Sequence, residues 1–125
     1  MEFAGAGLSL YLQEGRGVRE IKGATRRVGY RSPGSGAAWV NQSVPAGSAT
    51  GFYLTTDGFL DQAGGQKGFG FGRQRLVDLV ASLAGLPMAS QEEAFRRALR
   101  EYQGARAQRD DITVLGFRLS RGVHA

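Results

Sequence analysis

The chain has 125 residues, with 16 Lys and Arg against 11 Asp and Glu, one His and no Cys. This length suits a single domain, and the lack of Cys excludes disulfides, thiolate metal sites and cysteine nucleophiles. The one His, His124, lies next to the end of the chain, where chains usually fray, so histidine-based catalysis is not expected. Any chemistry must therefore rest on carboxylates, hydroxyls, Arg and Lys.

The net charge of +5 raises the question of a nucleic-acid partner. The basic residues are dispersed along the chain rather than gathered in one run, which argues against such a partner. No apolar run approaches the roughly 20 residues of a membrane span, and residues 1–5 lack the features of an export signal. We therefore expect a cytoplasmic protein that does not engage a membrane.

The first half of the chain predicts short β-strands separated by turn residues. The glycines on either side of Arg16 are typical of a hairpin turn. The segment 51–56 (GFYLTT) is the most strand-like, because aromatic and β-branched residues favour buried strands. A loop is expected over 32–36. The predicted strands cover residues 3–6, 8–12, 18–22, 39–44 and 51–56.

The second half changes to a helical pattern. After a flexible glycine-rich loop, apolar residues recur at three- and four-residue spacing in two segments, and Ser90 with Glu93 has the spacing of a capping box. Strands, two helices and a last strand predict an α+β domain, an antiparallel β-sheet with two packed helices. In chain order we expect the loop over 64–72, a helix from about 73 that ends at 85–87, a second helix from Ser90, a strand over 112–119 and a flexible tail over 121–125.

Two acidic sites lie at strand ends. Asp57–Gly58 directly follows the strand 51–56, and Asp110–Asp111 directly precedes the last strand. If these strands are antiparallel neighbours, Asp57 and Asp110 converge at one edge of the sheet. Converging carboxylates repel unless a cation or a proton lies between them, and an oxygen-only site favours Mg²⁺ or Mn²⁺. The alternative interpretation is that Asp-Gly forms an ordinary turn and that Asp110–Asp111 merely ends a loop.

Other motifs carry less weight. The segment 68–72 (GFGFG) is rich in glycine but lacks the G-K-[ST] ending of a phosphate-binding P-loop. The two predicted helices could mimic a helix-turn-helix, but amphipathic helices packed on a sheet explain the same pattern. The aromatic residues are expected in the core rather than on a stacking platform: Trp39, Phe52, Tyr53 and Phe95.

Three segments resemble, in the same order, those of bacterial metal-dependent protein serine/threonine phosphatases. They are 52–62 (FYLTTDGFLDQ), 68–76 (GFGFGRQRL) and 109–119 (RDDITVLGFRL). The family is the PPM (protein phosphatase 2C) superfamily, in its SpoIIE-type branch. The upstream segment 3–6 (FAGA), and 21–23 (IKG) followed by 28–30 (VGY), are also similar to this branch.

In this family two Mn²⁺ or Mg²⁺ ions activate a water that attacks the phosphorus of phosphoserine or phosphothreonine. The resemblance implies that Asp57 and Asp110 are metal ligands, and that Gly58 and Asp111 orient the site without binding the metal. It also implies a phosphoprotein substrate, such as the antagonist of an anti-sigma factor, and a role in signal transduction.

The resemblance covers the C-terminal part of the family's αββα sandwich, which we place at residues 1–120. The N-terminal half, with its Gly-His-Gly turn and the aspartate that bridges both metals, has no counterpart in this sequence. We therefore expect weak metal binding by this chain alone, and exposed apolar faces that a homodimer covers. Two other interpretations stay open: a non-catalytic regulatory module, and a basic nucleic-acid-binding domain that uses the helix within 91–109.

Overall fold

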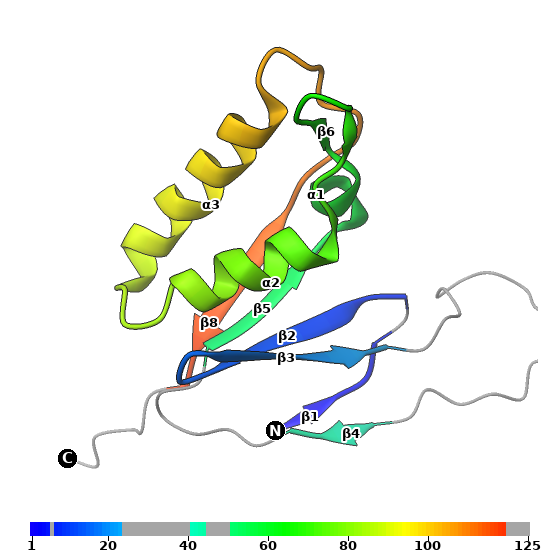
Figure 1. Ribbon diagram of the computed structural model, residues 1–125. Helices are drawn as coiled ribbons and strands as arrows, with labels where there is room; N and C mark the ends of the chain where they lie inside the picture. The colour runs from blue at the N-terminus through cyan, green and yellow to red at the C-terminus, as the bar shows by residue number, and fades with distance from the viewer. Residues whose placement is uncertain (6, 24–40, 45–50, 120–125) are drawn as a thin grey trace, which may run out of the picture.

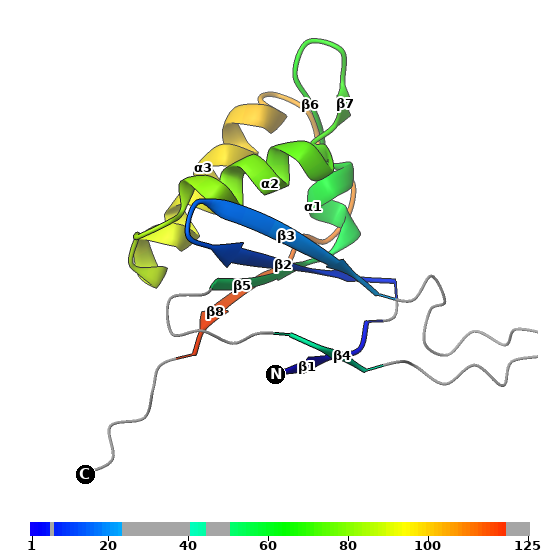
Figure 2. The same ribbon diagram turned by 60° about the horizontal axis from the view of Figure 1, so that its bottom comes forward.

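The computed structural model describes residues 1–5, 7–23, 41–44 and 51–119 of the chain. Within these residues, helices cover one face of a four-stranded sheet, and a two-stranded ladder lies against the other face (Figures 1 and 2). The helices are α1 (Asp57–Asp61), α2 (Gly72–Ser82) and α3 (Met88–Gln103). The strands are β1 (Glu2–Phe3), β2 (Ser9–Glu14), β3 (Gly17–Lys22), β4 (Gln42–Ser43), β5 (Gly51–Thr55), β6 (Ala63–Gly64), β7 (Phe69–Gly70) and β8 (Val114–Arg118).

The main sheet has the strand order β3-β2-β5-β8, and all of its neighbours are antiparallel. The β2–β3 hairpin turns at Gly15 and Arg16, as the sequence predicted, and Gly15 has a φ of 59°. A glycine with positive φ at the first position of a two-residue turn matches the right-handed twist of the flanking strands. The smaller ladders pair β1 with β4 and β6 with β7, both antiparallel.

Successive side chains along the central strands point to opposite faces of the sheet, and this divides the core into two clusters, one on each face. On the helical side, Tyr53 of β5 packs with Phe59 and Phe95. On the opposite side, Phe52 packs with Leu10 and Leu12, and its ring stacks on Phe117 at 5.0 Å between centroids. Phe52, Tyr53 and Phe95 are thus core residues, as predicted.

The observed architecture confirms the predicted α+β class with an antiparallel sheet and two packed helices, α2 and α3. The short helix α1 is an addition, because Asp57–Gly58 begins a helix rather than a turn. The predicted glycine-rich loop is also more regular than expected, since its first part forms the β6–β7 hairpin and Phe71 is buried. Of the predicted strands 3–6 and 39–44, residues 6, 39 and 40 lie outside the described residues, and Ala4, Gly5, Asn41 and Val44 are not part of β1 or β4.

The predicted capping box is wrong. Helix α3 begins two residues before Ser90, its N-cap is Pro87, and no side chain caps it. The backbone N–H of Gln91 donates to the Pro87 carbonyl at 3.1 Å, so Ser90 lies inside the first turn. The carboxylate of Glu93 instead accepts a hydrogen bond from Arg100 at 2.9 Å.

Several predictions concern residues outside those that the structure describes: the loop 32–36, the core position of Trp39, the resemblance at 28–30 and the tail 121–125. Among the residues that are described, none of the helices combines the length and the apolar character needed to cross a membrane.

Helix α2 is tied to β3 by an ion pair between Arg73 and Glu20. Burial raises the pKa of Glu20, but the hydrogen bonds from Arg73 and Ser9 and the nearby positive charges outweigh it and hold this pKa below its ordinary value. A carboxylate whose pKa is lower in the folded state stabilises the fold above its unfolded pKa and loses this contribution as the pH falls.

We therefore expect the stability of the chain to fall as the pH drops below the ordinary Glu20 pKa of 4.5. Glu20→Gln should be less stable than the wild type at pH 7, and the difference should shrink on acidification. Urea denaturation of both proteins across this pH range measures the effect. If the free energies of unfolding of the two proteins changed in parallel with pH, this result would contradict a role for the Glu20 charge.

Candidate metal site

The pairing of β5 with β8 brings the two acidic sites to one edge of the sheet. The strands are antiparallel neighbours, with Thr55 opposite Val114 at the end of the ladder. Asp57 opens helix α1 just beyond β5, and Asp110 and Asp111 lie in the segment that leads into β8. Figure 1 shows this segment passing beside α1. The sheet register thus supports the convergence that the sequence predicted for these ends.

Gly58 is the point of closest approach between α1 and this segment. A Cβ built on Gly58 would lie well inside van der Waals contact with the Asp111 carbonyl oxygen, and only 3.0 Å from the Asp111 carbonyl carbon. The same Cβ would lie 3.4 Å from the Cβ of Asp110. A residue without a side chain is therefore required where the two acidic sites meet.

Thr56 joins the two chain segments just before the acidic residues. Its backbone N–H donates to the Thr113 carbonyl at 3.1 Å, and its hydroxyl accepts a hydrogen bond from the Thr113 N–H at 3.0 Å. The hydroxyl also donates to the Asp111 carbonyl at 3.3 Å. These bonds extend the β5–β8 ladder by side-chain contacts and fix Asp111 beside Gly58.

The segment 104–111 is exposed along its whole length, yet it is held by several hydrogen bonds. The Asp110 carboxylate accepts the N–H of Asp111 at 2.7 Å, and Gln108 donates to the Asp110 carbonyl at 2.8 Å. The buried side chain of Gln62, which follows α1, donates to the Ala107 carbonyl at 3.0 Å. Asp110 therefore lies in a segment that is anchored before and after it.

The donor chemistry of this edge fits a hard divalent cation. Asp57, Asp110 and Asp111 are exposed and offer only oxygen atoms, which Mg²⁺ and Mn²⁺ prefer. Among residues 1–5, 7–23, 41–44 and 51–119, however, no group of three or more acidic, His or Cys side chains lies close enough to hold a metal ion. The described part of the chain thus brings together two acidic segments but not a complete set of metal ligands.

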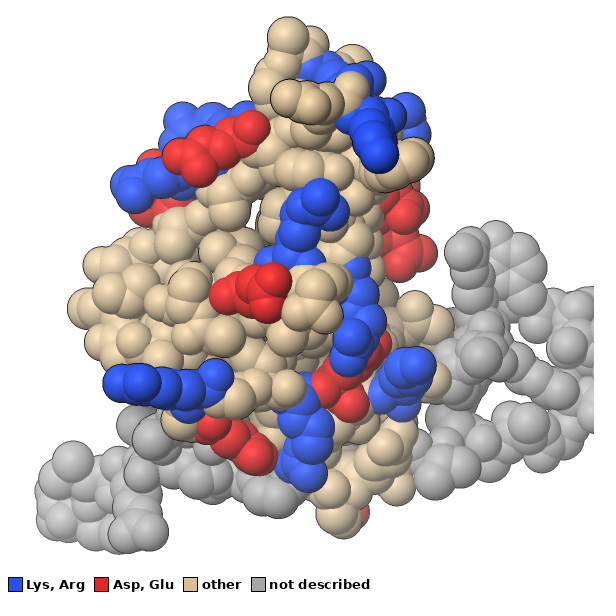
Figure 3. All heavy atoms as spheres, viewed as in Figure 1, with Lys and Arg blue, Asp and Glu red and all other residues tan. Residues whose placement is uncertain are grey.

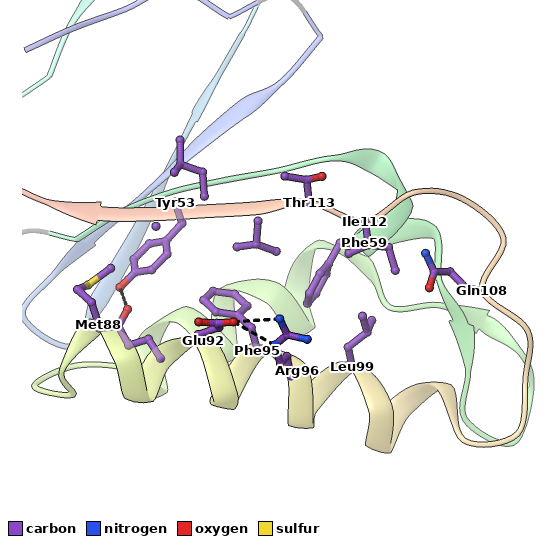
Figure 4. A pocket seen from close by; sticks show the side chains of 14 residues that line it. Tyr53, Phe59, Met88, Glu92, Phe95, Arg96, Leu99, Gln108, Ile112 and Thr113 are labelled. Carbon is purple, nitrogen blue, oxygen red and sulfur yellow. Dashed lines mark hydrogen bonds and ion pairs between the residues drawn. The ribbon is translucent and has the colours of Figure 1, made fainter.

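A groove of about 630 Å³ lies beside this edge, between helix α3 and strands β5 and β8 (Figure 4). Tyr53, Phe59 and Phe95 form its inner wall, and the ion pair of Glu92 with Arg96 lies along α3. The acidic residues of the site do not line it, but Gln108, Ile112 and Thr113 do. The groove and the carboxylate edge therefore share the segment that leads into β8.

The charges of the described residues do not form a nucleic-acid footprint on the face that Figure 3 shows, where basic and acidic side chains are interspersed. On α3, Arg96 pairs with Glu92 and Arg100 pairs with Glu93, both at 2.9 Å. These acidic partners offset the charge of the helix on which the nucleic-acid interpretation depends.

Asp57, Gly58, Asp110 and Asp111 are the site residues predicted from the sequence, and the fold brings their segments together. Thr56 and Gln62, which hold these segments in place, were not among the predicted site residues. The Thr56 contacts follow from the β5–β8 register and could have been inferred once that pairing was assumed. The Gln62 contact could not, because no local pattern indicates that a polar side chain after α1 turns inward.

A sequence model of the family described as Stage II sporulation protein E (SpoIIE) matches residues 2–120. The chain belongs to this family, which confirms the predicted resemblance. A search of curated proteins found no match.

A solved structure described as the "SiaA-PP2C domain of Pseudomonas aeruginosa" is similar to this chain, with a TM-score of 0.86 and 49% sequence identity. The match covers 95% of this chain and 46% of that structure. The chain therefore has the fold of part of a PP2C domain and spans less than half of that domain structure.

Proposed function

We propose that this chain supplies part of the centre of a metal-dependent protein phosphatase that acts on phosphoserine or phosphothreonine. The observation that carries the proposal is the meeting of Asp57–Gly58 with Asp110–Asp111 at one sheet edge, through the β5–β8 pairing and the close approach at Gly58. Membership of the SpoIIE family and the similarity to a PP2C domain support it.

In this proposal Asp57 and Asp110 hold Mn²⁺ or Mg²⁺, two ions in the complete centre. When bound, such ions supply an activated water and offset the charge of a phosphoryl group. Gly58 allows the two carboxylate segments to approach, and Asp111 is held in place through its carbonyl by Thr56. A further carboxylate is needed to complete the centre, because the described residues hold no group of three or more candidate ligands.

The proposed function also includes a substrate, a cellular compartment and an oligomeric state. The substrate would be a phosphoprotein, such as the antagonist of an anti-sigma factor, and the enzyme would act in the cytoplasm as part of a signalling pathway. A homodimer would cover apolar side chains that the fold leaves exposed, among them Leu115 of the edge strand β8, which is 54% exposed.

The test is a calorimetric titration of the full chain with Mn²⁺, for the wild type and for Asp57→Asn. We expect Asp57→Asn to weaken binding by at least about tenfold, or about 1.4 kcal/mol, because a charged ligand is lost. Asp78→Asn is the matched control, since this exposed aspartate of α2 only accepts a hydrogen bond from Gln74. It should bind Mn²⁺ like the wild type.

Binding that Asp57→Asn leaves unchanged would contradict the proposed site. Absence of binding up to millimolar Mn²⁺ would favour the second candidate, a non-catalytic interaction module. The specific observation for this candidate is the incomplete ligand set among the described residues. Such a module would bind a partner without turnover of a phosphoserine peptide.

A further inference from the structure

Gln62 is a buried polar residue at the junction of α1, the β6–β7 hairpin and the segment 104–111. Gln62 is only 1% exposed, and its side-chain Nε2 donates to the carbonyls of Ala63, at 3.1 Å, and Ala107, at 3.0 Å. Since both partners are acceptors, the amide can satisfy them only with its nitrogen toward them. The orientation of the side chain is therefore fixed.

Hydrogen bonds from the two residues that flank α1 hold the 104–111 segment on either side of Asp110, and Arg106 of this segment also donates to the Gly65 carbonyl at 3.4 Å. Gln62 holds the Ala107 carbonyl before Asp110, and Thr56 holds the Asp111 carbonyl after it. Both anchoring residues flank α1, the helix that begins with Asp57. Because the segment is exposed and packs little apolar surface, these few bonds determine where Asp110 lies relative to Asp57.

Stability alone does not explain a glutamine at this position. The Oε1 atom of Gln62 is buried and has no hydrogen-bond partner among the described residues. A buried, unpaired amide oxygen costs free energy, and an apolar side chain of similar length would avoid that cost. What an apolar side chain cannot supply is the hydrogen bond that reaches the Ala107 carbonyl.

We propose that Gln62 is a positioning residue of the metal site, which fixes the segment carrying Asp110 against α1. The link to metal binding rests on the proposed function. The positioning of the segment itself does not, since it follows from contacts within the chain.

The first experiment measures the mobility of the segment in the full chain without any metal. Gln62→Met removes both donors at similar side-chain length. Gln91→Met is the control for loss of a buried amide, because Gln91 is 2% exposed and also donates to two carbonyls, those of Leu83 and Leu86, remote from the acidic residues. Unlike Gln62, Gln91 also accepts a hydrogen bond from the Tyr53 hydroxyl, at 2.6 Å. Backbone ¹⁵N relaxation should show the order parameters of 107–111 falling from about 0.85 to below about 0.6 in Gln62→Met alone.

The second experiment titrates the same proteins with Mn²⁺. Groups that orient metal ligands typically contribute 10–100-fold to metal affinity, so Gln62→Met should bind Mn²⁺ at least about tenfold more weakly than the wild type. Gln91→Met should remain within about twofold, even if both variants lose similar thermal stability.

The outcomes separate the two proposals. Unchanged order parameters at 107–111 in Gln62→Met would overturn the positioning role, as would an equal loss of affinity in both variants. If the wild type binds no Mn²⁺, the proposed function fails, but the order parameters still decide the role of Gln62. If Gln62→Met does not fold, Gln62→Asn keeps the amide, is too short to reach Ala107, and is subject to the same two measurements.

Discussion

Phe59→Ala should lower the free energy of unfolding by about 3–5 kcal/mol, the usual cost of removing a large buried aromatic side chain. Phe59 is 1% exposed and packs edge-to-face on Phe71, with ring centroids 5.0 Å apart, and on Phe95, at 6.1 Å. Urea denaturation followed by circular dichroism measures the loss.

Phe69→Ala is the matched control, because the Phe69 side chain is 68% exposed and only its backbone carbonyl accepts a hydrogen bond, from Tyr102. It should change the free energy of unfolding by no more than about 0.5 kcal/mol. Similar losses in both variants would show that Phe59 is not the core anchor that the structure indicates.

The same substitution connects the core to the acidic edge. Phe59 follows Asp57 by two residues, and it is the fully buried side chain of the short helix α1 in the helical core cluster, against which Leu60 also packs. A five-residue helix has too few internal hydrogen bonds to be stable by itself. The position of Asp57 therefore depends on the burial of Phe59 more than on helix formation.

The elements with a clear period could be predicted from the sequence. Aromatic and β-branched residues indicated β5, and apolar residues spaced three and four apart indicated α2 and α3. An element that buries one face repeats its apolar residues with the period of that element, so the pattern is visible in the sequence. Helix α1 has no such signal, since its five residues are too few to show a period and Asp-Gly is typical of a turn.

The start of α3 shows how a local motif can be misleading. The spacing of Ser90 and Glu93 also occurs inside helices, and here Pro87 sets the boundary instead. As the N-cap residue, Pro87 donates no intrahelical hydrogen bond, so its missing N–H costs nothing there. A helix start predicted from Pro87 would have been nearer to the observed one.

The candidate site could be predicted only in part, for a similar reason. Asp57 and Asp110 could be predicted because each lies next to a strand that is recognisable in the sequence. The single assumption that these two strands pair as antiparallel neighbours was enough to bring them together. The contact of Gln62 with Ala107 spans 45 residues and depends on the path of an irregular segment. Hydrophobic periodicity carries no information about such a path.

Gly58→Ala should weaken Mn²⁺ binding by about 10–100-fold, the range typical for changes that misplace metal ligands, and should destabilise the fold by about 2–3 kcal/mol. The added Cβ would overlap the Asp111 carbonyl oxygen, which is backbone and cannot rotate away. Relief requires α1 and the segment before β8 to separate, and this moves Asp57 away from Asp110. Calorimetric titration and urea denaturation of the full chain measure the two effects.

Gly17→Ala is the matched control, because a Cβ on this glycine would lie 3.5 Å from the Glu14 carbonyl oxygen, an ordinary contact. It should leave Mn²⁺ affinity unchanged and alter stability by less than about 0.5 kcal/mol. If Gly58→Ala lost stability but kept its affinity, the acidic residues would not need their close approach to bind the metal. If it kept both, α1 and the segment before β8 would be free to separate at no cost, and the packing at Gly58 would not define the site.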